Sequence, residues 1–211
     1  MTKTITRLFD DYSDATAALH DLERLGVPHD SVSIVANNAD GAHGTATSTL
    51  GDVNDHGDVG RGVSTGAAVG GVGGLLAGLG LLAIPGLGPI VAAGWLASTV
   101  VGAGIGAAGG AATGTIVGAL KEAGHTDDEA HVYLEGVRRG GTLLSARVDD
   151  TLATEAEAIL DRHRSVDATT RGTAYRQDGW SSFDDTAPAY SRDEVAAERD
   201  RYRSAPASTN Y

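Results

Sequence analysis

One stretch of the chain constrains its folding more than any other: residues 62–120 contain no charged side chain. These 59 residues hold 18 of the 30 glycines in a chain of 211 residues. A surface helix normally carries charged residues on its solvent side. We therefore expect this stretch to be buried in protein, in lipid or in an oligomer.

Within this stretch the glycines recur every four residues in two runs. The runs are Gly62, Gly66, Gly70, Gly74 and Gly78, then Gly102, Gly106, Gly110, Gly114 and Gly118. Residues four apart share one face of a helix, and a stripe of small residues lets two helices approach closely. Each glycine in a helix lowers its stability by up to ~1 kcal/mol relative to alanine. Close contact between helices or an apolar solvent must therefore offset the summed cost of the glycines in each run. We predict that these ten glycines carry helix packing and self-association.

A turn is predicted between the two runs. Its residues are Pro85, Gly86, Gly88 and Pro89. Prolines that bracket glycines favour a turn, which predicts a helical hairpin of about residues 62–84 and 90–120. At ~1.5 Å per residue both helices exceed the ~30 Å hydrocarbon core of a membrane. An inserted hairpin would leave both termini cytoplasmic. The alternative, a hairpin buried in a soluble assembly, stays open.

The flanking segments predict a small α+β domain that the glycine-rich hairpin interrupts. Residue spacing predicts strand, helix and strand over residues 1–36, and helix, strand and helix over residues 121–164. In both halves a strand is followed by two aspartates, Asp10-Asp11 and Asp149-Asp150, which we expect to cap the next helix. We expect both halves to pack on one small sheet with helices on one face.

The remaining segments carry few large apolar residues. Residues 37–61 are predicted to be a flexible linker, and residues 165–211 a largely disordered tail. Within the tail, the capping-box pattern of Ser191 and Glu194 predicts a short helix through about Arg203.

The composition excludes several classes of function. The chain has no cysteine, which excludes a disulfide framework, a thiolate metal site and a cysteine nucleophile. A net charge of −12 argues against a nucleic-acid partner, which needs a cationic face. No signal peptide is visible at the start, so we expect a cytoplasmic chain.

The sequence shows no spacing that meets a catalytic or metal-site template. The seven histidines lack the H-x-x-x-H and H-E-x-x-H patterns of zinc sites. A G-x-G-x-x-G match at residues 104–109 lies inside a long helical pattern rather than after a strand, which does not fit a dinucleotide site. We therefore predict no catalytic, cofactor-binding or metal-ligating residues, no cofactor, and a protein that is not an enzyme.

Several segments carry a family resemblance. They are the strand-like segments at residues 4–12 and 30–37, the Pro-Gly-x-Gly-Pro turn at 85–89 and the Tyr-x-Glu-Gly-Val-Arg-Arg-Gly-Gly run at 133–141. Together they resemble the bacterial heat-induced, general stress protein family (YflT-like), over about residues 3–164. The resemblance implies a stress-linked bacterial protein with a glycine-rich central hairpin. It supplies no catalytic residues.

Three functions follow as hypotheses. The first is a non-enzymatic stress-associated protein whose hairpin mediates membrane association, self-association or both. It would lie in the bacterial cytoplasm or on the cytoplasmic face of the inner membrane, with other copies of the chain as its partners. The second is a soluble oligomeric scaffold or adaptor that buries the hairpin in the assembly. The third is a module that binds a small ligand between the split domain and the hairpin.

Overall fold

Five strands and seven α-helices form the described part of the chain, which is residues 2–41, 80–84, 86–102 and 111–203 of a computed structural model. The strands are β1 (Thr2–Phe9), β2 (Val32–Asn37), β3 (Gly80–Ile84), β4 (Gly88–Gly94) and β5 (Thr142–Asp149). The helices are α1 (Tyr12–Leu25), α4 (Trp95–Gly102), α5 (Ala111–Glu122), α6 (Asp127–Arg138), α7 (Ala153–Arg162), α8 (Ala168–Gln177) and α9 (Arg192–Arg203). The predicted α+β class is confirmed, as is the predicted order β1-α1-β2 before the glycine-rich stretch and α6-β5-α7 after it.

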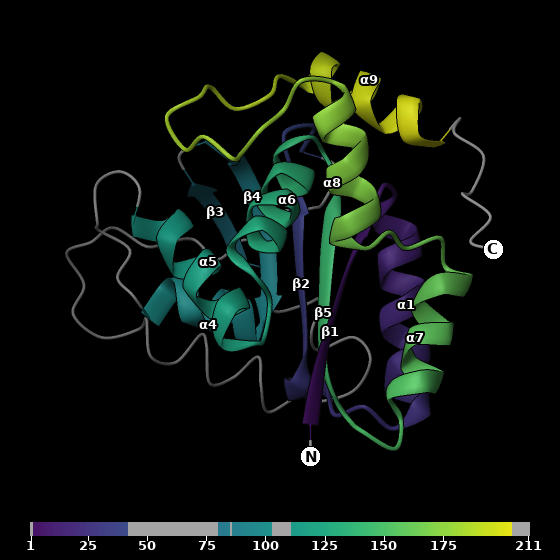
Figure 1. Ribbon diagram of the computed structural model, residues 1–211. Helices are drawn as coiled ribbons and strands as arrows, with labels where there is room; N and C mark the ends of the chain where they lie inside the picture. The colour runs from purple at the N-terminus through teal and green to yellow at the C-terminus, as the bar shows by residue number, and fades with distance from the viewer. Residues whose placement is uncertain (1, 42–79, 85, 103–110, 204–211) are drawn as a thin grey trace.

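The strands form one antiparallel sheet in the order β1-β5-β2-β4-β3 (Figure 1). β5 therefore lies between β1 and β2, although it comes much later in the chain. In this register Thr6 of β1 faces Ser145 of β5, and Ser145 faces Ser33 of β2. Because each neighbour is antiparallel, β1 and β2 run in the same direction on either side of β5, which is a split β-α-β arrangement.

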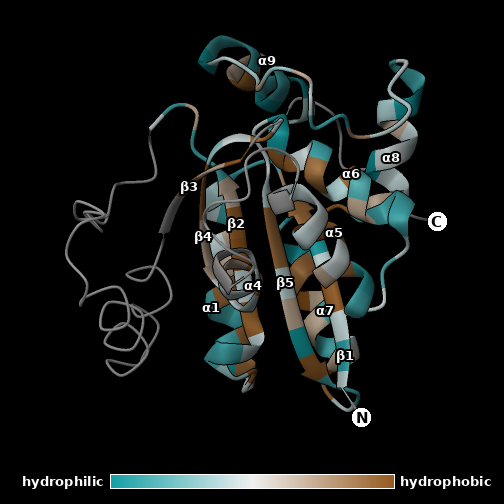
Figure 2. Cartoon of the chain, turned by 90° about the vertical axis from the view of Figure 1, so that its left-hand side faces the viewer, coloured by the Kyte–Doolittle hydropathy of each residue, from teal (hydrophilic) through white to brown (hydrophobic). Residues whose placement is uncertain are grey.

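Helices cover both faces of the sheet, whereas the sequence predicted helices on one face only (Figure 1). Helices α1 and α7 pack on one face, and α4, α5, α6 and α8 pack on the other. Successive side chains of a strand point to opposite faces, so Leu144 of β5 enters the α1/α7 core and Leu143 enters the other. The reason for the difference is that all six residues of β2 are buried, and a strand that is apolar on both sides needs cover on both sides. Figure 2 shows the hydrophobic residues along β2 and β5.

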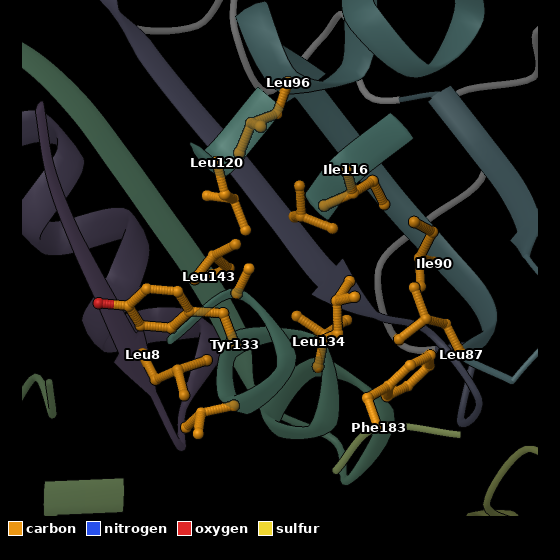
Figure 3. Close-up of a cluster of buried hydrophobic side chains, with 14 of the residues drawn as sticks. Leu8, Leu87, Ile90, Leu96, Ile116, Leu120, Tyr133, Leu134, Leu143 and Phe183 are labelled. Carbon is orange, nitrogen blue, oxygen red and sulfur yellow. The ribbon is translucent and has the colours of Figure 1, made fainter. Parts of the chain in front are cut away.

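The larger core lies on the α6 side of the sheet (Figure 3). Leu120 of α5, Leu134 of α6 and Leu143 of β5 meet there, each no more than 1% exposed. Tyr133 packs its ring into the same cluster, while its hydroxyl points away from it (Figure 3). At about 1.5–3 kcal/mol for each fully buried large side chain, this cluster is a major source of stability and fixes the position of α6 on the sheet.

Residues 80–94 form a β-hairpin, which corrects the prediction of a helical hairpin in that part of the chain. The turn lies at the predicted position. The Leu87 N–H donates to the Ile84 carbonyl at 3.1 Å, and Gly86 and Gly88 adopt positive φ angles of 77° and 82°. The strands form because β4 pairs with β2, which buries Ile90 and its neighbours on both faces. Of the second helix predicted over about residues 90–120, residues 90–94 belong to β4, whereas α4 and α5 are helical as predicted. Residues 62–79, Pro85 and 103–110 lie outside the described residues.

The segment after residue 165 is ordered through α9, which corrects the prediction of a largely disordered tail. Tyr175 of α8 and Val195 of α9 are 2% and 1% exposed. Arg171 of α8 forms an ion pair with Asp10 at 2.8 Å, and its guanidinium carbon lies 4.0 Å from the centre of the Tyr202 ring. The helix predicted from Ser191 is confirmed as α9.

Helix N-capping follows the sequence at two sites, one of them Ser191 with Glu194 at the start of α9, and departs from it at two. Thr126 and Glu129 form the predicted capping box at the start of α6. Asp11 occupies the N-cap position of α1, but its side chain makes no capping hydrogen bond. The pair Asp149-Asp150 does not cap α7, because a turn with a hydrogen bond from Leu152 N–H to the Asp149 carbonyl delays the helix until Ala153.

Candidate functional site

The described residues contain only part of the predicted glycine contacts. Gly114 and Gly118 lie on α5, where Gly114 is exposed and Gly118 half-buried, and Gly102 ends α4. A β-carbon added to Gly114 or Gly118 would meet no described atom within 4 Å. Outside the described residues lie Gly62, Gly66, Gly70, Gly74, Gly78, Gly106 and Gly110. The role of the glycine runs in helix packing stays a prediction.

The described part of the chain holds neither a membrane-spanning helix nor a metal-binding cluster. None of its helices has both the length and the apolar character needed to cross a membrane. Within residues 2–41, 80–84, 86–102 and 111–203, no three His, Asp or Glu side chains gather as a metal site would require.

A cavity of about 210 Å³ lies along the outer edge of β1. We call it the β1 pocket; its walls are Lys3, Thr4, Ile5, Thr6, Arg7, His125, Glu129, Tyr133, Glu157, Asp167, Ala168 and Thr169. The register of β1 and the starts of α6 and α8 bring these residues together from three distant parts of the sequence. Ligand pockets for drug-sized molecules are usually 300–1,000 Å³, so the β1 pocket suits a small group or one short segment of chain.

A chain of hydrogen bonds runs from the β1 pocket into the sheet. His125 Nε2 lies 2.8 Å from Thr6 Oγ1, which lies 2.9 Å from Ser145 Oγ. The Tyr133 hydroxyl donates to the Thr6 carbonyl at 2.9 Å, and the His125 and Tyr133 rings meet edge to face at 5.4 Å. A hydroxyl beside an imidazole is the pairing of an activated nucleophile. Thr6 is only 1% exposed, however, so the chain orients His125 instead of presenting the hydroxyl to a substrate.

Burial sets the protonation of the two aromatic groups in the β1 pocket. It lowers the pKa of His125, and the nearby Arg7 charge acts in the same direction, against the opposing pull of Glu129. Burial also raises the pKa of Tyr133 far above its usual range. Near pH 7 His125 is therefore an uncharged hydrogen-bond partner, and Tyr133 is a neutral donor.

The depressed pKa of His125 predicts that the folded state loses stability as pH falls below about 6.5. In that range the unfolded chain binds a proton at His125 that the folded chain does not, so the free energy of unfolding rises with pH. We expect His125→Gln, which keeps an amide near Thr6 and Glu129, to lose less stability than the parent between pH 7 and pH 5. Urea unfolding at both pH values measures this. An equal loss in the two proteins would show that His125 titrates normally in the fold.

A second polar cluster holds the C-terminal helices against α6. The Glu135 carboxylate is fully buried and accepts from Arg139 Nε at 2.6 Å and from Arg138 Nη1 at 3.3 Å. Arg139 also lies 4.3 Å from the centre of the Tyr175 ring of α8. The space left in this cluster is only about 10 Å³, about one water molecule. The cluster is therefore a structural joint and not a ligand pocket.

The glycines beside this cluster explain the run at residues 133–141. A β-carbon on Gly136 would come within 2.6 Å of Leu8 Cδ1, and one on Gly141 within 2.8 Å of the Gly136 carbonyl oxygen. Gly140 has a φ of 104°, which ends α6 in the left-handed conformation. Close approach of α6 to β1 thus accounts for Gly136, the left-handed backbone for Gly140, and contact with the end of α6 for Gly141.

The sequence did not identify the β1 pocket as a site. Its usable signal was Thr6 and Ser145, polar residues at strand positions whose alternation points into the core. Only the pairing of β1 with β5, 139 residues apart at this point, brings the two hydroxyls together.

The chain was also compared with known proteins. No protein-family model, curated protein or solved structure matches it. Its function is therefore inferred from its own residues and their arrangement.

Proposed function

We propose that this chain is a non-enzymatic, stress-associated bacterial protein that acts by associating with other copies of itself through its glycine-rich stretch. The split α+β domain holds that stretch between β2 and α6. The link to stress rests on the resemblance of residues 3–164 to the general stress protein family. The proposed location is the cytoplasm or the cytoplasmic face of the inner membrane, with both termini cytoplasmic.

The observation that carries the proposal is the open glycine face of α5. Gly114 and Gly118 continue the four-residue spacing of the second run, and no described atom lies within 4 Å of either β-carbon position. Each glycine in a helix costs about 0.5–1 kcal/mol relative to alanine. Contacts within the described part of the chain do not offset this cost at these two positions. Close approach of a helix from another copy would offset it, because a smooth stripe maximises backbone contact.

The proposal is tested with the full chain carrying Gly114→Leu and Gly118→Leu together. We expect the parent to form oligomers and the double variant to dissociate at least about tenfold more readily, equivalent to about 1.4 kcal/mol. Sedimentation equilibrium over a range of concentrations measures the shift. Cross-linking in cells checks that the same association occurs at natural abundance.

Ala158→Leu provides the matched control, because Ala158 is an exposed small residue on α7, away from the glycine runs. It adds one leucine to an exposed helix position and is expected to leave the oligomer unchanged. A parent chain that is monomeric throughout, or a double variant that associates as the parent does, would contradict the proposal.

The membrane form of the proposal needs its own measurement. Carbonate-washed membranes and the soluble fraction of the producing bacterium are separated, and the full-length chain is located in each. Retention in the washed membrane would support insertion of the glycine-rich stretch. Recovery in the soluble fraction as an oligomer would support the scaffold alternative.

A further inference from the structure

We propose that the outer edge of β1 binds an extended peptide segment bearing a carboxylate side chain. The peptide backbone would pair with Thr4 and Thr6, and its carboxylate with Arg7. The proposal is independent of self-association through the glycine runs, and rests on the geometry of the β1 pocket.

The backbone of β1 presents unused hydrogen-bonding groups on its outer side. In an antiparallel pair, opposite residues alternate between those that exchange hydrogen bonds and those whose backbone groups point away. Leu8 directs both its N–H and its carbonyl outward, so Thr6 and Thr4 do the same. The Thr6 carbonyl accepts from Tyr133 and from Arg7. No described residue forms a hydrogen bond on this side of β1 with the Thr6 N–H, the Thr4 N–H or the Thr4 carbonyl.

The protein already pairs an extended residue with the neighbouring part of this edge. The Leu8 N–H donates to the Val166 carbonyl at 2.9 Å, and the Val166 N–H donates to the Leu8 carbonyl at 2.8 Å. This is an antiparallel bridge. The chain then turns into α8 at Ala168, so Val166 does not extend the pairing to the Thr6 N–H or to the backbone groups of Thr4. An added strand would continue the same pattern along β1, a recognised mode of peptide binding.

Arg7 provides the β1 pocket with a cation that can bind a carboxylate. Its guanidinium forms no ion pair with any described residue, and it donates only to the Thr6 carbonyl, at 3.2 Å. Guanidinium groups match carboxylates in geometry and can bind them with two parallel hydrogen bonds.

The other charged groups of the β1 pocket are already engaged. Glu157 pairs with Lys3 at 2.7 Å, Asp167 accepts from the Thr170 N–H at 2.8 Å, and Glu129 accepts from the Thr126 N–H at 2.8 Å. Asp167 and Glu129 keep their negative charges, and Lys3 is paired with Glu157, so Arg7 is the cation of this pocket that pairs with no described carboxylate. This favours an acidic peptide over a second copy of β1, whose segment from Thr2 to Phe9 contains no acid.

The probe is a fluorescein-labelled peptide, acetyl-Thr-Val-Glu-Val-Thr-amide, titrated with the full chain and followed by fluorescence anisotropy. Two matched peptides isolate the two contacts. One replaces the glutamate by glutamine, and the other carries N-methyl groups on alternate backbone nitrogens that would face β1. We expect the parent peptide to bind with a dissociation constant below about 100 μM, and each altered peptide to bind at least about tenfold more weakly.

Two variants of the protein test the same two contacts, the backbone pairing and the carboxylate–Arg7 pair. Arg7→Gln removes the charge, and Thr4→Pro removes an outward N–H at an edge position, where proline is tolerated. Each is expected to weaken binding of the glutamate peptide by about tenfold or more. Arg162→Gln is the control for charge loss, since Arg162 is exposed at the end of α7. If Thr4→Pro fails to fold, Arg7→Gln and the N-methylated peptide still decide the matter.

Several results would overturn the proposal. They are no binding at 1 mM protein, equal affinity for the N-methylated peptide, or equal affinity of the Arg7→Gln protein. If free succinate displaces the peptide completely, with a dissociation constant for succinate in the low-millimolar range, the β1 pocket binds a small carboxylate and not a strand. Loss of self-association in Thr4→Pro alone would show that a second copy occupies the edge.

Discussion

Replacing Glu135 with alanine is expected to lower the free energy of unfolding by about 3–5 kcal/mol. The carboxylate is fully buried between Arg138 and Arg139, and its removal leaves two guanidinium groups with less compensation. Arg139 also contacts Glu198 of α9 and the Tyr175 ring, so the loss should loosen α8 and α9 along with α6. Urea unfolding followed by circular dichroism and by tryptophan fluorescence measures the change.

Two variants show whether the buried charge is responsible. Glu157→Ala removes a carboxylate from the partly exposed pair with Lys3, and is expected to cost under about 1 kcal/mol. The double variant Glu135→Leu with Arg139→Leu removes both members of the closer buried pair. It should be less destabilised than Glu135→Ala, because only the Arg138 guanidinium, and not two guanidinium groups, is left without the carboxylate. If Glu135→Ala lowers the free energy of unfolding by less than about 1 kcal/mol, water reaches the two guanidinium groups and solvates their charges.

Replacing Gly94 with alanine is expected to lower the free energy of unfolding by about 4 kcal/mol or more, a large part of the ~5–15 kcal/mol of an ordinary protein. Gly94 has a φ of 85°, and an added β-carbon would overlap the Val32 carbonyl oxygen and come within 2.7 Å of Ser33 Cα. These are backbone atoms of a central strand and cannot move aside. Ser33 also bonds the Ala93 carbonyl and the Leu96 N–H, so the start of α4 would be displaced. Thermal unfolding, or the soluble yield where no folded protein is recovered, measures the effect.

Gly26→Ala separates the two causes of that loss. Gly26 has a φ of 103°, but a β-carbon there meets nothing within 4 Å. Its cost is therefore the backbone strain alone, about 1–2 kcal/mol. Similar losses for Gly26→Ala and Gly94→Ala would show that the strand carrying Ser33 yields to the added methyl group.

Local periodicity was enough to predict the split domain. The alternation in β1 and the three- to four-residue spacing of apolar residues in α1 are local patterns typical of a strand and of an amphipathic helix. The capping box of Thr126 and the left-handed Gly26 mark helix ends through backbone chemistry that does not depend on the rest of the fold. Such features can be predicted from a short window of sequence.

The hairpin of β3 and β4 could not be predicted in the same way. Its residues are small and apolar, and such a run is compatible with a strand or with a buried helix. The regular glycines favoured the helix. Pairing with β2 decides in favour of the strand, and β2 lies far away in the sequence.

Helix α8 escaped prediction because its contacts are not those of an ordinary core. Its buried face includes Arg171, which pairs with Asp10 and lies over the Tyr202 ring. Charged and aromatic residues in this pattern lower the mean hydropathy of the segment, which makes it resemble a disordered tail. The β1 pocket was not predicted for a related reason, since its polar residues come from β1, the region of α6, α7 and the start of α8, and no local pattern joins them.

The place of β5 between β1 and β2 has a consequence for the time course of folding. On the ribosome, β1 and β2 emerge early, but neither has its central partner until residue 149 has been made. At ~5–20 residues per second, the roughly 110 intervening residues delay the sheet by about 5–20 s. During that interval β1 lies unpaired, and β2 can pair only with β4 on one side. The nascent chain is therefore expected to depend on holding chaperones, and its yield should fall steeply when those chaperones are engaged elsewhere.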